Sequence, residues 1–74
     1  MARSQKLLDK IRKNPKNVSL HDFEALINSF GCIEIGGKHP KAIIGVYTMP
    51  YKPENPVKAC YVNDLLEIID SFVR

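Results

Sequence analysis

Apolar side chains recur at helical spacing in three segments of the chain, which predicts three helices. The first covers residues 4–13 and ends because Pro15 forces the preceding residue out of helical geometry. The second begins after Ser19, an N-cap candidate, and ends at Gly31, for which we expect a left-handed C-cap. The third runs from Cys60 or Tyr61 to Phe72.

Between the second and third helices, β-branched residues form three short extended segments. We expect strands over residues 32–35, 41–44 and 46–49, with a tight turn at Gly36-Gly37 between the first two. Pro50 limits ladder pairing and favours an edge position for the last strand. The predicted fold is therefore α+β, in one domain over residues 1–74. Its order is α-α-β-β-β-α, with helices packed on one face of a three-stranded antiparallel sheet.

Positive charge is concentrated in two parts of the chain. The 74 residues carry a formal net charge of +3, from 11 Lys and Arg against 8 Asp and Glu. Lysine and arginine dominate residues 1–17, and lysines also dominate the stretch from Lys38 to Lys58. Such patches attract phosphate by Coulomb forces and counterion release, so we expect a polyanionic partner. The alternative is that the lysines only solvate a small domain.

The two cysteines, Cys32 and Cys60, lie far apart and outside any Cys-x-x-Cys motif. Each has apolar neighbours, so we expect two buried, reduced thiols rather than a disulfide. A zinc site that combined them with His21 and His39 would match no usual ligand spacing, so no metal is expected. No cofactor is expected either, because the glycine pair before Lys38 lacks the spacing of a phosphate-binding loop.

The chain contains no long apolar run and no signal-peptide core. A transmembrane helix needs about 20 predominantly apolar residues, and none of the apolar stretches approaches that length. We therefore expect a cytoplasmic protein without membrane contact.

His39 is the strongest candidate for chemistry. It follows the predicted Gly36-Gly37 turn at the start of a strand, between Lys38 and Lys41. A histidine can take or give a proton near neutral pH, and neighbouring ammonium groups would attract phosphate and keep the imidazole neutral. The alternative is an ordinary surface histidine near a hairpin. We interpret His21, in the first turn of the second helix, as an exposed surface residue.

Two tyrosines lie near lysines on the third strand and its exit. Aromatic rings beside cations can stack on unpaired bases, which makes Tyr47 and Tyr51 candidates for RNA contacts. We favour the alternative, in which Tyr47 belongs to the core and Tyr51 packs against its loop.

Several short motifs occur in a characteristic order. Asn-Pro-Lys-Asn-Val at residues 14–18 precedes Phe-Glu-Ala-Leu at 23–26, and Gly37-Lys38-His39 follows the second helix. The stretch over residues 56–62 then runs into Leu-Leu-Glu-Ile-Ile at 65–69. In order and spacing, these motifs resemble the HicA-like toxin family over most of the chain, from Lys6 to about Phe72.

The resemblance implies a fold like that of double-stranded-RNA-binding domains. It also implies a metal-independent endonuclease that acts on messenger RNA and is held inactive by an antitoxin protein of the HicB type. By its matching position, His39 would be the catalytic residue and would remove a proton from the ribose 2′-hydroxyl. Lys38 and Lys41 would stabilise the growing phosphorane charge. Lys16, Lys52 and Lys58 are expected to hold the RNA backbone away from the site of chemistry.

The chain also departs from the family pattern in three places. Lys38 stands where the family usually has Ser or Thr, and Pro40 directly follows His39. Many members have a further histidine or acid in the third strand, where this chain has Met-Pro-Tyr at residues 49–51. A catalytically inactive RNA-binding or protein-interaction domain of the same fold is therefore the alternative function.

Overall fold

The computed structural model describes residues 2–72 of the chain, and the side chains of residues 5–72. In that range the chain forms three helices and a three-stranded antiparallel sheet, so the α+β fold and the element order predicted from sequence are confirmed. The elements are α1 (Ala2–Lys13), α2 (Leu20–Phe30), β1 (Cys32–Glu34), β2 (Lys41–Ile44), β3 (Tyr47–Pro50) and α3 (Ala59–Phe72).

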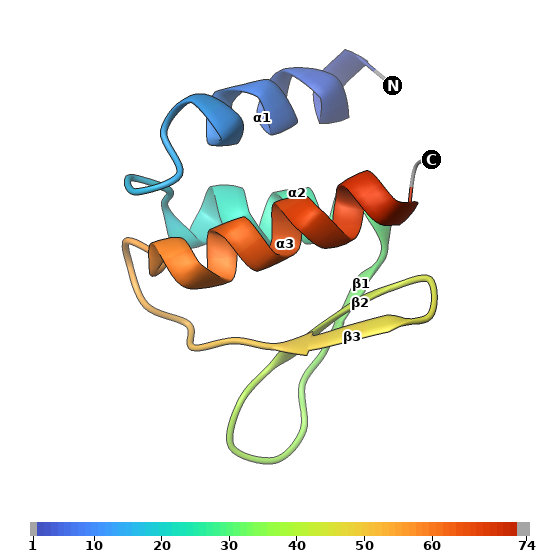
Figure 1. The fold of residues 1–74 in the computed structure, drawn as a ribbon. Helices are drawn as coiled ribbons and strands as arrows, with labels where there is room; N and C mark the ends of the chain where they lie inside the picture. Colours follow the sequence, from blue (N-terminus) through green and yellow to red (C-terminus); the bar gives the residue numbers. More distant parts are fainter. Residues whose placement is uncertain (1, 73–74) are drawn as a thin grey trace.

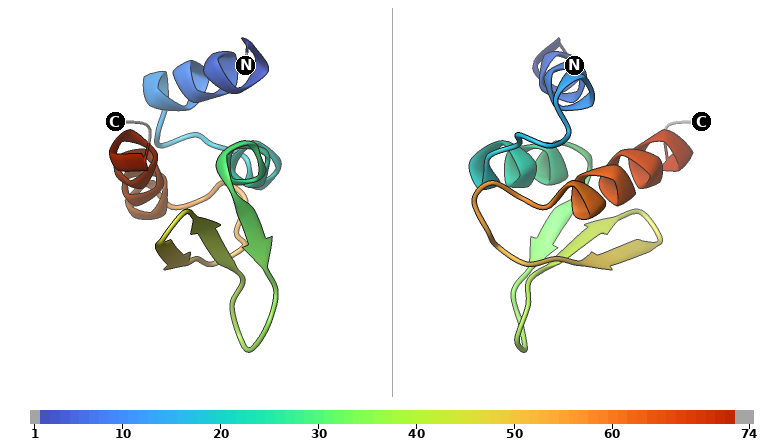
Figure 2. Two further views of the ribbon diagram at one scale, coloured as in Figure 1. Left: turned by 90° about the vertical axis from the view of Figure 1, so that its right-hand side faces the viewer. Right: turned by 60° about the vertical axis from the view of Figure 1, so that its left-hand side comes forward.

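The elements are stacked in layers (Figure 1). Helices α2 and α3 lie side by side over one face of the sheet, and α1 lies on the opposite side of these two helices (Figure 2). The apolar stripes found in the sequence explain this arrangement, because their members point into the space between the layers. The most deeply buried helical residues are Phe23, Leu26 and Ile27 of α2 and Val62, Leu65 and Ile69 of α3. Leu8 and Ile11 bury the inner face of α1.

The central strand of the sheet is β2, which pairs antiparallel with β1 on one side and β3 on the other. Ala42 and Ile44 of β2 are buried beneath the helices, so the alternate residues Lys41 and Ile43 point to the uncovered side. We call that uncovered side the outer face of the sheet. It carries the side chains of every second residue on all three strands.

The edge position of β3 predicted from Pro50 is confirmed, although the strand runs one residue later than predicted. Val46 lies in the turn with Gly45, whose φ of 61° suits the first central position of a tight hairpin turn. The backbone N–H of Tyr51 donates to the Pro40 carbonyl at 3.1 Å. Along an antiparallel pair, every second residue of a strand forms hydrogen bonds to the neighbouring strand. Tyr51 is at such a position and Pro50 is not, so the N–H that proline lacks removes no hydrogen bond between β2 and β3.

Two expectations were wrong, namely the burial of both cysteines and the left-handed backbone at Gly31. Both Cys32 and Cys60 are free thiols, but they are exposed rather than buried. Cys32 pairs with Ile43 across the sheet and therefore lies on its outer face. Gly31 does end α2, with its N–H donating to the Ile27 carbonyl at 2.7 Å, but its φ is −165°, which is extended rather than left-handed.

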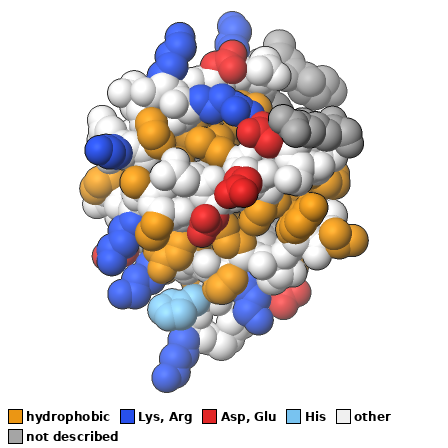
Figure 3. All heavy atoms as spheres, viewed as in Figure 1, with side chains coloured by type: hydrophobic (Ala, Val, Ile, Leu, Met, Phe, Trp, Pro, Cys, Tyr) orange, Lys and Arg blue, Asp and Glu red, His pale blue; other side chains and the backbone are white. Residues whose placement is uncertain are grey.

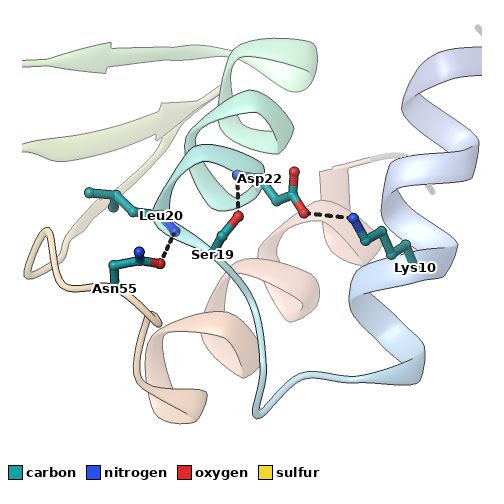
Figure 4. A network of polar contacts seen from close by, with 5 residues as sticks. All are labelled: Lys10, Ser19, Leu20, Asp22 and Asn55. Atoms are coloured by element: carbon teal, nitrogen blue, oxygen red, sulfur yellow. Dashed lines mark hydrogen bonds and ion pairs between the residues drawn. The ribbon is translucent and has the colours of Figure 1, made fainter.

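The start of α2 is held by a network of polar contacts (Figure 4). Ser19 is the N-cap, as predicted, and its Oγ accepts the N–H of Asp22 at 3.1 Å. Asn55 Oδ1, from the connection between β3 and α3, accepts the N–H of Leu20 at 3.3 Å. Lys10 Nζ of α1 reaches Asp22 Oδ2 at 3.0 Å. These contacts join α1, α2 and the β3–α3 connection at one end of the molecule.

Tyr51 closes the core below α2. Its ring meets Phe23 edge-to-face, with centroids 5.0 Å apart, and its hydroxyl donates to Glu24 Oε2 at 2.8 Å. Burial raises the pKa of Tyr51 well above its ordinary value, and the hydrogen bond to Glu24 raises that pKa further. The structure reverses the two expected positions: Tyr51, expected to pack against its loop, lies in the core and is 1% exposed, whereas Tyr47, expected in the core, is 40% exposed.

Candidate nucleic-acid interface

His39 lies in the loop that joins β1 to β2, at the end of the sheet farthest from α1 (Figure 1). The loop covers residues 35–40 and turns at Gly37, whose φ of 71° is favourable only for glycine. Lys38 and His39 are both exposed, so the imidazole is open to solvent. His39 therefore lies at the turn between two strands and is exposed, as the sequence predicts.

The strand register brings Lys52 to the same place as His39. Lys41 pairs with Pro50, and the hydrogen bond from Tyr51 to Pro40 continues that register by one position. Beyond this pair, the next residue on the β2 side is His39 and the next on the β3 side is Lys52. His39 lies in the loop two positions before Lys41, and both residues are exposed.

We call His39 with Lys38, Lys41 and Lys52 the His39 cluster. Figure 3 shows a histidine side chain with lysine or arginine side chains around it at the end of the molecule where this loop lies. Two acids lie close to these lysines in sequence or register. Glu54 follows Lys52 by two positions, and Glu34 pairs with Lys41 across β1 and β2. Among the residues that the structure describes, neither acid forms an ion pair with the three lysines. Their ammonium groups are exposed and can meet phosphate oxygens.

The other two predicted RNA-binding lysines, Lys16 and Lys58, form a separate group. An isolated bridge pairs Val18 with Val57, and the N–H of Val57 donates to the Val18 carbonyl at 2.9 Å. Lys58 follows this bridge directly and Lys16 precedes it by two positions, so both lie where α2 and α3 begin. Both are exposed. Lys16 and Lys58 thus lie apart from His39, as expected, whereas the strand register places Lys52 beside it.

A third basic surface runs along α1, within the basic stretch over residues 1–17 that the sequence indicates, although its lysines are not among the predicted RNA-binding residues. Lys6, Lys10 and Lys13 line a shallow hollow with Asp9 and Asn14, with a volume of about 400 Å³. Lys10 is paired with Asp22, whereas no ion pair is found for Lys6 or Lys13 among the described residues. The signal was present in the sequence, because spacings of three and four residues place these lysines on one helix face.

His21 is exposed near the start of α2, on a different element from His39. Within the described part of the chain, no three His, Cys, Asp or Glu side chains come together in a way that could hold a metal ion. None of the helices in the described range has the length and apolarity needed to cross a bilayer.

Comparison of the chain with protein-family models, curated proteins and solved structures gives no match. The likeness to HicA toxins and to the double-stranded-RNA-binding fold therefore rests on the sequence motifs given above. What carries a functional argument is the arrangement of side chains at the His39 cluster.

Proposed function

We propose that this protein binds RNA at the His39 cluster and cleaves it there without a metal ion, as the toxin of a toxin–antitoxin pair. The observation that carries the proposal is one exposed imidazole with Lys38, Lys41 and Lys52 around it on a hairpin end. RNA presents both groups that this arrangement fits, a 2′-hydroxyl that can lose a proton and a phosphate that gains negative charge. The family resemblance, which assigns catalysis to His39, points the same way.

The reaction needs only groups that RNA and the His39 cluster supply. Neutral His39 takes the proton of a ribose 2′-hydroxyl, and the 2′-oxygen attacks the adjacent phosphorus. The bond from phosphorus to the 5′-oxygen of the next nucleotide breaks, and that oxygen takes a proton from the imidazolium or from water. The products are a 2′,3′-cyclic phosphate and a 5′-hydroxyl. Ammonium groups of Lys38 and Lys41 stabilise the extra charge on the phosphorane.

The second candidate function is RNA binding without cleavage. It is favoured by a specific observation, because the cluster holds a single imidazole and His21 lies on another element. Cleavage with a single histidine is slow, since no second group gives a proton to the leaving oxygen. The basic surface alone is sufficient for binding.

The test is incubation of labelled RNA with the wild-type protein and with His39→Ala, in the presence of EDTA. Cleavage with cyclic phosphate ends by the wild type, and none by His39→Ala, is the expected result. His21→Ala is the matched control, because it removes the other exposed histidine and should leave cleavage unchanged. Binding of RNA by both proteins without any cleavage supports the second function instead.

Growth arrest provides a test of the toxin role. Expression of the wild type in a bacterial host should arrest growth, and His39→Ala should remove the arrest while circular dichroism shows an unchanged fold. A small partner protein of the HicB type, present in the same cytoplasm, would relieve the arrest. Equal toxicity of the two proteins contradicts a catalytic role for His39.

A further inference from the structure

A groove runs between the edge strand β3 and helix α3. It has a volume of about 350 Å³ and is open to solvent. One wall is formed by the residues of β3, including Tyr47, Met49 and Pro50, and the other by α3 residues that include Asp64, Glu67 and Ile68. The α3 residues are spaced by three or four positions, so they form one stripe along that helix.

Apolar side chains are unusually exposed at one end of this groove. Val46 is 93% exposed, Phe72 is 45% exposed and Tyr47 is 40% exposed. Phe72 lies beside the β2–β3 turn, because a Cβ atom at Gly45 would come within 2.8 Å of its ring, and Val46 and Tyr47 follow Gly45 along the chain. Only one other large apolar side chain in the described range, Ile35, is as exposed. Contiguous exposed apolar surface on a small soluble domain marks an interaction site.

The charge of the groove is opposite to that of the whole protein. The protein has a formal net charge of +3, yet Asp64 and Glu67 are the only charged residues that line the groove in the described part of the chain. Figure 3 shows acidic and apolar side chains together over α3 and β3 on this face. Two exposed carboxylates repel RNA phosphates and attract Lys or Arg. The groove therefore favours a protein segment over a nucleic acid.

The backbone of β3 offers little to an added strand. Because residues 49 and 51 direct their backbone groups toward β2, Thr48 and Pro50 direct theirs to the open edge. Pro50 has no N–H, which leaves Thr48 as the donor at that edge. A partner on this side is held by side chains in the groove rather than by strand addition.

From these observations we propose that the β3–α3 groove binds a segment of a protein partner that inserts apolar side chains and flanks them with Lys or Arg. The apolar side chains contact Tyr47, Met49 and Ile68, and the cations meet Asp64 and Glu67. The proposal is independent of RNA cleavage, because none of these residues belongs to the His39 cluster.

The probe is a short amphipathic peptide of leucine and lysine, titrated into labelled full-length protein and followed by backbone amide shifts. The expected shifts concentrate on residues 47–49 and 64–71. Asp64→Lys with Glu67→Lys should weaken binding by about tenfold or more and favour a matched peptide of leucine and glutamate. Glu34→Lys with Glu54→Lys is the control of equal charge change, and it should leave lysine-peptide binding within about twofold of wild type.

Several results would overturn the proposal. These are shifts spread over the whole surface, unchanged binding by the charge-reversed variant, or groove shifts caused by RNA instead of the peptide. A free protein that sediments as a dimer with these amides protected would assign the groove to a second copy of the chain. If the charge-reversed variant does not fold, Asp64→Asn with Glu67→Gln replaces it, with weaker peptide binding as the expected result. The RNA-cleavage assay is unaffected by any of these outcomes, so the two proposals fail separately.

Discussion

At Gly31, the space around one α-carbon decides which residue the chain can hold. A Cβ atom there would overlap the carbonyl oxygen of Ile43 and lie 2.9 Å from its carbonyl carbon. The extended φ of Gly31 suits any residue, so the requirement for glycine is steric and comes from β2. Tyr51 is a second position whose surroundings determine the properties of the side chain, because its hydroxyl is buried and donates a hydrogen bond to Glu24.

Gly31→Ala is expected to lower the free energy of unfolding by about 1–3 kcal/mol, because the backbone of β2 must shift to admit the methyl group. Gly36→Ala is the control, since a Cβ atom there would meet nothing within 4 Å. Its effect should stay within about 0.5 kcal/mol. Urea denaturation followed by circular dichroism measures both, and equal stability of the two variants would contradict the close approach.

The raised pKa of Tyr51 predicts a loss of stability at alkaline pH. The unfolded chain releases the phenolic proton near pH 10, whereas the folded protein holds it to higher pH. The stabilisation is therefore complete below about pH 10 and is lost as the pH rises through the folded-state pKa. Tyr51→Phe should cost about 1 kcal/mol at neutral pH and flatten this alkaline decline. Tyr47→Phe is the control, because Tyr47 is exposed, and it should change neither the stability at neutral pH nor its decline at alkaline pH. Urea denaturation from pH 8 upward measures both.

At the scale of elements, α1 is attached to the rest of the fold by apolar packing and by two ion pairs at its surface. Leu8 and Ile11 are buried, 6% and 2% exposed. Lys10 pairs with Asp22 of α2, and Arg12 pairs with Asp70 of α3. The hydrogen bond to Asp70 is the main reason that the pKa of Arg12 is raised. Surface ion pairs of this kind stabilise proteins by at most about 1 kcal/mol, so the packing dominates.

Ile11→Ala is accordingly expected to cost about 2–4 kcal/mol, because it opens a cavity between α1 and α2. Lys10→Ala should cost less than about 1 kcal/mol, since Lys10 is largely exposed. Chemical denaturation gives both values, and amide hydrogen exchange shows whether α1 opens alone. A larger loss for Lys10→Ala than for Ile11→Ala would show that charge, not packing, attaches this helix.

At the scale of the whole molecule, the fold separates surfaces of opposite charge. The His39 cluster lies at the hairpin end of the sheet, the α1 lysines lie on the far side of the helices, and the acidic groove lies between β3 and α3. The residues that form these surfaces come from different elements of a molecule that spans 33 × 26 × 18 Å. RNA and a cationic protein segment therefore have different sites available to them.

RNA binding at the hairpin end should depend on Lys52 more than on Lys6. Lys52→Ala is expected to weaken binding and to lower the slope of log affinity against log salt by about 0.7, the share of one phosphate contact on a single strand. Lys6→Ala removes the same charge from the far side of the helices and is the control. Fluorescence anisotropy over a range of salt concentrations measures both slopes. Equal slopes for the two variants would contradict this preference, and a lower slope for Lys6→Ala alone would place the RNA site at α1.

Much of the fold could be predicted from local pattern. The apolar stripes, the Ser19 cap and the prolines identified three helices and three strands because these signals act within one or two turns of the chain. The same reasoning misplaced Cys32, because alternation along a strand does not tell which face the helices will cover. Lys16 was grouped with Lys52 for the same reason, since their separation depends on how the connections pack.

The sequence by itself determined the element order, the edge position of β3 and the exposed histidine between lysines, because each follows from residue type and spacing. Tertiary structure alone decided that Lys52 joins His39, that Gly31 must be glycine and that Asp64 and Glu67 face β3 across a groove. The physical reason is that strand register and layer packing bring together residues from distant parts of the chain. No local pattern encodes those distances.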